Sequence, residues 1–185
     1  MLGTSSSNLD KSINESLARI NPKSILELGC GMGKLGELIK SLGLTVNITA
    51  IQKLFSQSDH DLLISKGYNK IVDSDILEYF KIGFDENYEL TVIMDVIEHF
   101  LYSDALSIID FALYRSDWLL LVWPSKHPQA ATSNQFDRHR TSFEIDTLTS
   151  KFDVVYYEQR GFAQVHFLHR YHLCVIRGHM NSKIF

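Results

Sequence analysis

The sequence is poor in cysteine, in positive charge and in long apolar runs, and each shortage excludes a class of protein. Its two cysteines, Cys30 and Cys174, do not make a disulfide framework, so a reducing, cytoplasmic location fits best. The longest apolar run, residues 118–123, suits a buried strand and is far too short to span a bilayer. The first residues lack a charged segment followed by an apolar core, which argues against a secretory signal. We therefore expect no association with a membrane.

Positive charge does not dominate, because the chain has 18 Lys and Arg and 22 Asp and Glu, which gives a net charge of −4. A chain with this balance has no global basic field to attract nucleic acid. Basic character gathers only locally, around Arg138, His139 and Arg140. We therefore expect the ligand to be a small molecule and not a nucleic acid.

What the chain does contain is a regular alternation of strand and helix patterns, within a length that suits one domain over residues 1–185. Apolar and β-branched runs predict strands at 25–28, 46–51, 70–72, 90–94, 118–122, 152–157 and 171–177. Apolar residues at helical spacing predict helices at 9–20, 34–42, 58–66, 76–80, 104–114 and 143–150, the last capped by Thr141 or Ser142. Such alternation predicts a parallel sheet with right-handed crossovers. The last two strands have only a loop between them, so we expect them to pair antiparallel.

The most informative segment is the strand at 25–28, which runs directly into Gly29-Cys30-Gly31-Met32-Gly33 and then into the helix at 34–42. Alternate glycines leave room for a ligand against the backbone and permit positive φ. A strand, a glycine turn and a helix N-terminus together make a nucleotide cradle. With Glu27, the pattern is Glu-x-Gly-x-Gly-x-Gly. It resembles the first motif of the class I S-adenosylmethionine-dependent methyltransferases.

Other interpretations of the same glycines are weaker but stay open. Gly31, Gly33 and Gly36 satisfy the dinucleotide spacing, but two residues then separate the strand from the first glycine of that motif. A P-loop does not fit, because Leu35 follows Lys34 where Ser or Thr is needed. The plainest alternative is a strand–turn–helix whose glycines serve tight packing alone.

The resemblance implies a fold and a set of cofactor contacts. The fold is a doubly wound, mostly parallel sheet of seven strands with an antiparallel C-terminal hairpin. The cofactor is S-adenosylmethionine (SAM), and the implied binding positions follow the ends of the strands: Glu27, Gly29, Cys30, Gly31, Gly33, Gln52, Asp75, Ile76 and Asp95. The family usually has an acid where Gln52 stands, to hold the ribose hydroxyls. Asp75 matches the acid that accepts a hydrogen bond from adenine, although Asp is also a favoured helix N-cap.

The segment Asp95-Val96-Ile97-Glu98-His99 follows the strand at 90–94 and resembles the fourth motif of that family. The resemblance places Asp95 beside the sulfonium and substrate, and it makes Asp95 and His99 candidate catalytic residues. A structural role for His99 stays open. We expect no metal here, because the zinc helix pattern has a second His where Asp95 stands.

Residues 124–142 form a long polar loop after the strand at 118–122, and long loops in compact domains usually serve function. The stretch 134–143 resembles a segment that covers the active site in one methyltransferase subgroup. His139 is a candidate general base, because an imidazole with a pKa of about 6.5 removes protons near neutrality. Arg140 and Asn134 are candidate substrate-binding residues, and Arg140 suits a carboxylate or phosphate. A solvated loop without function is the alternative.

These inferences favour a methyltransferase that acts on oxygen or nitrogen of a small molecule. We expect residues 1–20 to form a helical lid and residues 124–142 to form the active-site loop, or the second subunit of a homodimer to cover the site. A catalytically silent binding subunit of a complex is the first alternative, because Gln52 replaces the usual acid. A nucleic-acid methyltransferase is the second, and the charge balance argues against it.

Overall fold

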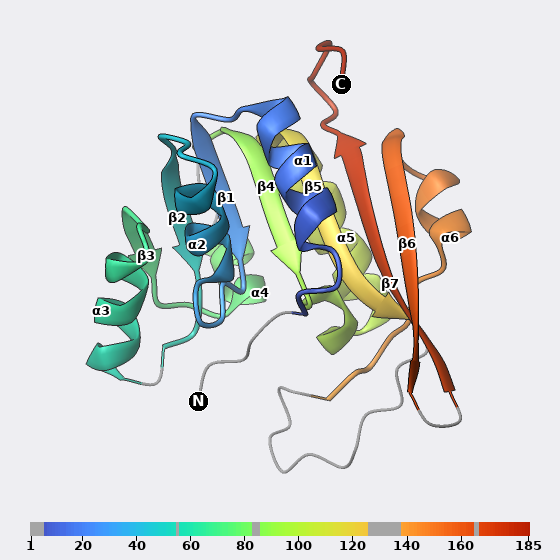
Figure 1. Ribbon diagram of the computed structural model, residues 1–185, viewed down its shortest axis with the longest axis horizontal. Helices are drawn as coiled ribbons and strands as arrows, with labels where there is room; N and C mark the ends of the chain where they lie inside the picture. The colour runs from blue at the N-terminus through green and yellow to red at the C-terminus, as the bar shows by residue number, and fades with distance from the viewer. Residues whose placement is uncertain (1–5, 55, 83–85, 126–137, 165–166) are drawn as a thin grey trace.

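A seven-stranded sheet in the order β3-β2-β1-β4-β5-β7-β6 runs through the centre of the protein (Figure 1). The structure is a computed structural model and describes residues 6–54, 56–82, 86–125, 138–164 and 167–185, with the backbone alone at 162–164 and 167–169. The strands are β1 (Ser24–Leu28), β2 (Asn47–Ile51), β3 (Lys70–Val72), β4 (Tyr88–Met94), β5 (Ser116–Ser125), β6 (Val154–Gln164) and β7 (Phe167–Arg177). The helices are α1 (Asp10–Ile20), α2 (Lys34–Ser41), α3 (Gln57–Ser65), α4 (Ile76–Ile82), α5 (Tyr102–Arg115), α6 (Ile145–Thr149) and the 3-10 helix η1 (Ile97–His99).

Strands β1 to β5 are parallel, whereas β7 is antiparallel to both β5 and β6. This arrangement confirms the doubly wound, mostly parallel sheet with an antiparallel C-terminal hairpin. The chain runs outward from β1 through β2 to β3 and then returns to place β4 on the other side of β1. The strand order therefore reverses between β1 and β4, and in open α/β sheets ligands bind at the carboxyl side of such a switch point.

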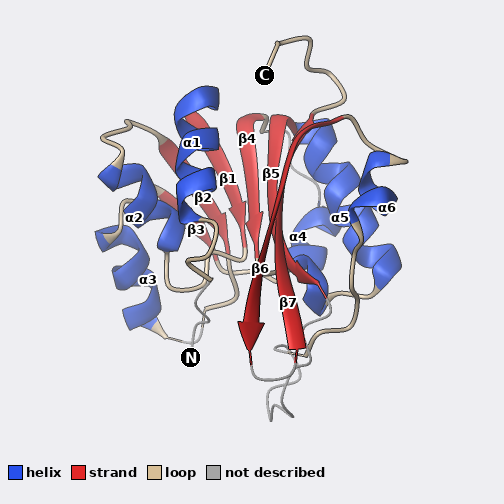
Figure 2. Ribbon diagram, turned by 45° about the vertical axis from the view of Figure 1, so that its right-hand side comes forward, coloured by secondary structure: helices blue, strands red, loops and turns tan. Residues whose placement is uncertain are grey.

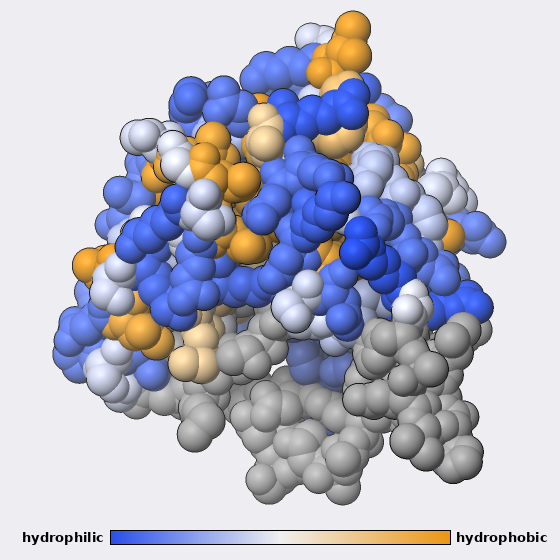
Figure 3. All heavy atoms as spheres, in the orientation of Figure 1, coloured by the Kyte–Doolittle hydropathy of each residue, from blue (hydrophilic) through white to orange (hydrophobic). Residues whose placement is uncertain are grey.

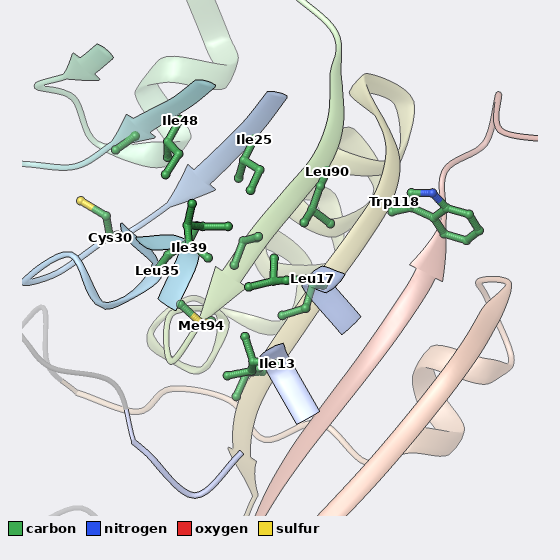
Figure 4. Packing of buried hydrophobic residues seen from close by; sticks show 14 of the residues in the cluster. Ile13, Leu17, Ile25, Cys30, Leu35, Ile39, Ile48, Leu90, Met94 and Trp118 are labelled. Carbon is green, nitrogen blue, oxygen red and sulfur yellow. The ribbon is translucent and has the colours of Figure 1, made fainter. Parts of the chain in front are cut away.

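Helices cover both faces of the sheet, with α1, α2 and α3 on one face and α4, α5 and α6 on the other (Figure 2). Successive residues of a strand point to opposite faces, so one strand contributes to two cores. Ile25 belongs to the core under α1 and α2, whereas Leu26 and Leu28 belong to the core under α5. Figure 4 shows the first core, where Ile13 and Leu17 of α1 lie against the sheet.

The outer surface over α1 and α2 is mostly polar (Figure 3). In Figure 3 the face that carries α1 and α2 is predominantly hydrophilic, with hydrophobic side chains scattered between charged ones. Within the described ranges, no helix combines the length with the apolar character that crossing a bilayer requires.

Two local predictions were wrong. A loop was expected between the last two strands, but β6 continues to Gln164 and β7 begins at Phe167. The two strands are longer than predicted because their backbones pair with each other despite a polar, glycine-containing sequence. Helix α6 begins at Ile145 and has no side-chain cap from Thr141 or Ser142. The preceding chain stays extended because Phe143 is fully buried and its carbonyl accepts a hydrogen bond from the Trp123 indole at 2.9 Å.

Candidate active site

The glycine turn after β1 has the left-handed backbone that alternate glycines permit. Gly29, Gly31 and Gly33 have φ values of 73°, 50° and 81°. The turn is tied to β2, because the Gly29 amide donates to the Ile51 carbonyl at 2.9 Å. A Cβ at Gly29 would stand 2.6 Å from a methyl carbon of Val96, so this position has no room for a side chain.

A cleft of about 310 Å³ opens at the switch point, beside this turn. Ligand pockets of small-molecule enzymes have volumes from about 300 Å³ upward. Its walls come from the carboxyl ends of β1, β2, β3 and β4, together with the start of α5 and the chain before α6. Six residues singled out from the sequence line it: Gly29, Gln52, Asp75, Ile76, His99 and Arg140.

Gln52 holds the glycine turn in place. Its side-chain oxygen accepts a hydrogen bond from the Gly31 amide at 3.0 Å, and its side-chain nitrogen donates to the Lys53 carbonyl at 2.9 Å. A carboxylate at this position has no hydrogen to donate to the Lys53 carbonyl. The amide therefore has one more hydrogen bond than an acid would have, and this bond orients the Gln52 side chain whose oxygen holds Gly31.

Asp75 has the geometry of a helix N-cap and also lines the cleft. Its Oδ1 accepts from the Leu77 amide at 2.8 Å and from the Glu78 amide at 3.4 Å. Its other carboxylate oxygen, Oδ2, accepts no hydrogen bond from the part of the chain that the structure describes. The capping interpretation and the binding interpretation of Asp75 are thus compatible, since each uses a different oxygen.

The candidate catalytic residues predicted from the sequence lie in or next to the segment after β4. Asp95 has a φ of 53°, a left-handed conformation that Asp tolerates better than most residues. Its Oδ2 accepts from the Ser6 amide at 3.0 Å, which brings the chain before α1 to this edge of the sheet. The rings of His99 and His139 meet edge to face with their centroids 5.1 Å apart. Asn134 lies outside the described residues.

No family model and no curated protein sequence matches the chain. Solved structures do resemble it. TehB from Haemophilus influenzae superposes with a TM-score of 0.65 at 16% identity, over 93% of this chain and only 63% of TehB. The methyltransferase domain of bacterial CtHen1-CN has a TM-score of 0.64 at 21% identity, over 92% of this chain and 98% of that domain. Magnesium protoporphyrin IX methyltransferase (ChlM) from Synechocystis PCC 6803, solved with bound SAH, has a TM-score of 0.61 at 15% identity, over 91% and 81% of the two chains.

This chain has the class I methyltransferase fold. Five of the predicted cofactor positions do not line the cleft: Glu27, Cys30, Gly31, Gly33 and Asp95. Glu27 and Cys30 are buried, with 1% and 5% of their surface exposed. The Glu27 carboxylate accepts a hydrogen bond from the Tyr68 hydroxyl at 2.5 Å, which joins β1 to the chain just before β3. Glu27 therefore ties β1 to the chain before β3 and does not line the cleft.

Lys34 fastens the N-terminal segment of the methyltransferase fold and was missed as a site residue. Its ammonium forms an ion pair with Asp10 and donates to the Ser6 carbonyl. Together with the Ser6–Asp95 bond, these contacts hold residues 6–10 next to the glycine turn. The sequence identifies Lys34 only as the first residue of a helix, and it does not indicate that the side chain binds Asp10 and Ser6.

Burial raises the pKa of Glu27 from 4.5 to about 8, and the Tyr68 hydrogen bond opposes that shift. In the unfolded chain the group loses its proton near pH 4.5, whereas the folded protein keeps it to about pH 8. We therefore expect the free energy of unfolding to fall as pH rises through this window, by about 1.4 kcal/mol for each unit of pKa difference. The Glu27→Gln variant carries no titratable proton at this position, so its stability should change less over the same range.

Urea unfolding of the wild type and of Glu27→Gln at several pH values between 4 and 9 measures the difference. Glu15→Gln is the matched control, because the Glu15 side chain is 61% exposed and forms a surface ion pair with Lys11. The control should follow the wild type. An equal pH dependence in Glu27→Gln and the wild type would contradict the assignment.

Proposed function

We propose that this chain is a SAM-dependent methyltransferase that transfers a methyl group to an oxygen or nitrogen of a small molecule. The observation that carries the proposal is the cleft at the switch point, with the left-handed glycine turn on one side and Asp75 and Ile76 on another. The structure of ChlM with bound SAH supports SAM as the cofactor for this fold. The net charge of −4 supports a small molecule over a nucleic acid as the acceptor.

In this proposal the two ends of the cleft hold different parts of the cofactor. Asp75 accepts a hydrogen bond from the adenine amino group through Oδ2, and Ile76 lies against the ring. The glycine turn lies against the ribose and the methionine part. The Asp95 carboxylate, oriented by the Ser6 amide, faces the positive sulfonium and stabilises it by charge.

When bound, SAM supplies an electrophilic methyl group, and the electron pair of the broken carbon–sulfur bond stays on sulfur. The protein's part is to align the acceptor and exclude water. Arg140 lines the cleft and binds an anionic group of the acceptor. His139 takes up the acceptor's proton or holds the acceptor, with His99 beside it.

Replacing Asp75 separates capping from cofactor binding. Asparagine caps helices as well as aspartate does, so Asp75→Asn should leave the free energy of unfolding nearly unchanged. Its amide nitrogen would take the place of Oδ2 and oppose the adenine amino group, because both are donors. We expect the affinity for S-adenosylhomocysteine (SAH) to fall by about 1.5–3 kcal/mol, the usual worth of a hydrogen bond to a charged group.

Calorimetry with SAH and thermal unfolding measure the two effects separately. Asp75→Ala is the companion variant and should lose both affinity and about 1 kcal/mol of stability, because it also removes the cap. If Asp75→Asn binds SAH as tightly as the wild type, Asp75 is a cap alone.

The proposed activity is tested by incubating the protein with SAM and a panel of small hydroxyl and amine acceptors, with SAH formation as the readout. Acceptor-dependent release of SAH supports the proposal. Tight SAH binding with no release for any acceptor would favour the catalytically silent binding subunit instead.

A further inference from the structure

Three metal-ligating side chains meet at the end of β4, beside the cleft. Glu98, His99 and His139 each bring one ligand atom to a group in which all three atoms lie within 4.8 Å of one another. Glu98 Oε1 and His99 Nε2 stand 4.0 Å apart. Nitrogen and oxygen ligands on one tetrahedral ion at about 2.1 Å stand roughly 3.4 Å apart, so small side-chain rotations suffice to close the set.

Main-chain hydrogen bonds hold these three side chains close together. Helix η1 carries Glu98 and His99 as neighbours, and the Glu98 carbonyl accepts from the Arg140 and Thr141 amides at 2.7 and 3.2 Å. These two bonds hold the chain around His139 against η1. The three side chains therefore converge because main-chain bonds hold their two segments together, and not through a chance contact of long side chains.

Of the three side chains, Glu98 gives the strongest reason to expect a bound cation. Only 2% of its surface is exposed, and its Oε2 accepts no hydrogen bond from any residue in the described ranges. A buried carboxylate oxygen without a hydrogen bond destabilises a protein, and a bound cation supplies the missing interaction.

We propose that Glu98, His99 and His139 bind one divalent cation of the Zn²⁺ type, with an open coordination position toward the cleft. Two imidazoles and one carboxylate suit zinc and its first-row neighbours, and three protein ligands with an open position are typical of catalytic zinc sites. The open position faces the acceptor, because His99 and Arg140 both line the cleft. The sequence argued against a metal here because Asp95 stands where the zinc helix pattern has its second His. The second histidine of this cluster, His139, comes instead from a distant segment.

The role of this ion rests on the proposed function. An acceptor hydroxyl that binds the open position loses its proton to solvent more easily, because the cation lowers its pKa. The new bond then forms between that oxygen and the methyl carbon, as the carbon–sulfur bond breaks and its electron pair stays on sulfur. His139 acts in this case as a ligand and not as a base. The substrate class is a hydroxyl compound with an anionic group for Arg140.

The test is calorimetric titration of metal-free full-length protein with Zn²⁺, without cofactor or acceptor. We expect one site in the wild type, and a loss of at least roughly 100-fold in affinity in Glu98→Gln and in His139→Gln, because loss of an outer-shell partner alone costs 10–100-fold. Glutamine has the shape of the protonated acid, so Glu98→Gln should fold. His179→Gln is the matched control, because His179 and Asp110 form a histidine–carboxylate pair at 2.9 Å elsewhere on the surface.

Equal Zn²⁺ affinity in the wild type and in both cluster variants would overturn the site, as would the absence of binding in the wild type. The visible absorption of bound Co²⁺ provides a second readout, which both cluster variants should lose and the control should keep. A parallel SAH titration separates the two proposals. Protein that binds SAH but not Zn²⁺ retains the proposed function and loses this inference, and protein that binds Zn²⁺ but not SAH does the reverse.

Discussion

Replacing Gly29 by alanine should lower the affinity for SAH by at least roughly 100-fold, or about 2.7 kcal/mol. Gly29 has a φ of +73°, and the added Cβ would stand 2.6 Å from a methyl carbon of Val96. Both residues line the cleft, so relief of the contact must displace either the glycine turn or the valine from the place where the cofactor lies. Calorimetry with SAH measures the loss.

Gly43→Ala provides a closely matched control. Gly43 has a φ of +65°, but a Cβ there meets no atom within 4 Å. Both variants should lose about 1–2 kcal/mol of stability from the left-handed backbone, which urea unfolding records. Only Gly29→Ala should lose SAH affinity. Wild-type affinity in Gly29→Ala would mean that the cofactor lies elsewhere.

Replacing His139 by alanine should lower kcat by about 10²–10⁴-fold and leave SAH affinity almost unchanged. His139 stands next to Arg140 in sequence, packs edge to face on His99 and belongs to the cluster with Glu98. Without the His139 imidazole the acceptor loses its proton less easily, whether the imidazole takes the proton itself or holds a cation that lowers the acceptor's pKa. SAH release from the most active acceptor of the panel is the readout.

His99→Ala is the informative comparison, and His179→Gln is the control that should keep full turnover. If His139→Ala keeps full turnover while His99→Ala loses it, the catalytic assignment moves to the segment after β4. If both variants keep turnover, alignment of the acceptor suffices and Asp95 becomes the remaining candidate.

The sheet was predictable because its strands are short, apolar and separated by clear helix patterns. The switch point and the antiparallel hairpin followed from the alternation together with the family resemblance. The length of β6 and β7 did not, since residues 158–164 pair through the backbone although all of them except Phe162 are polar or small. The start of α6 also escaped prediction, because it depends on the Trp123–Phe143 hydrogen bond between distant residues.

For the site, too, some features could be predicted from the sequence and others could not. Gly29, Gln52, Asp75 and Ile76 follow strand ends, so the order of strands was enough to place them on one cleft. The role of Gln52 in tying down Gly31 depends on side-chain direction, which the sequence does not display. The meeting of His139 with Glu98 depends on the main-chain bonds from Arg140 and Thr141, and neither segment alone marks the other.

Calorimetric titration of the full chain with SAH and with NAD⁺ tests most directly whether the glycine turn holds SAM. We expect one SAH site per chain, lost in Gly29→Ala and kept in Gly43→Ala, and no heat of binding with NAD⁺. Binding of NAD⁺ without any response to SAH would contradict it.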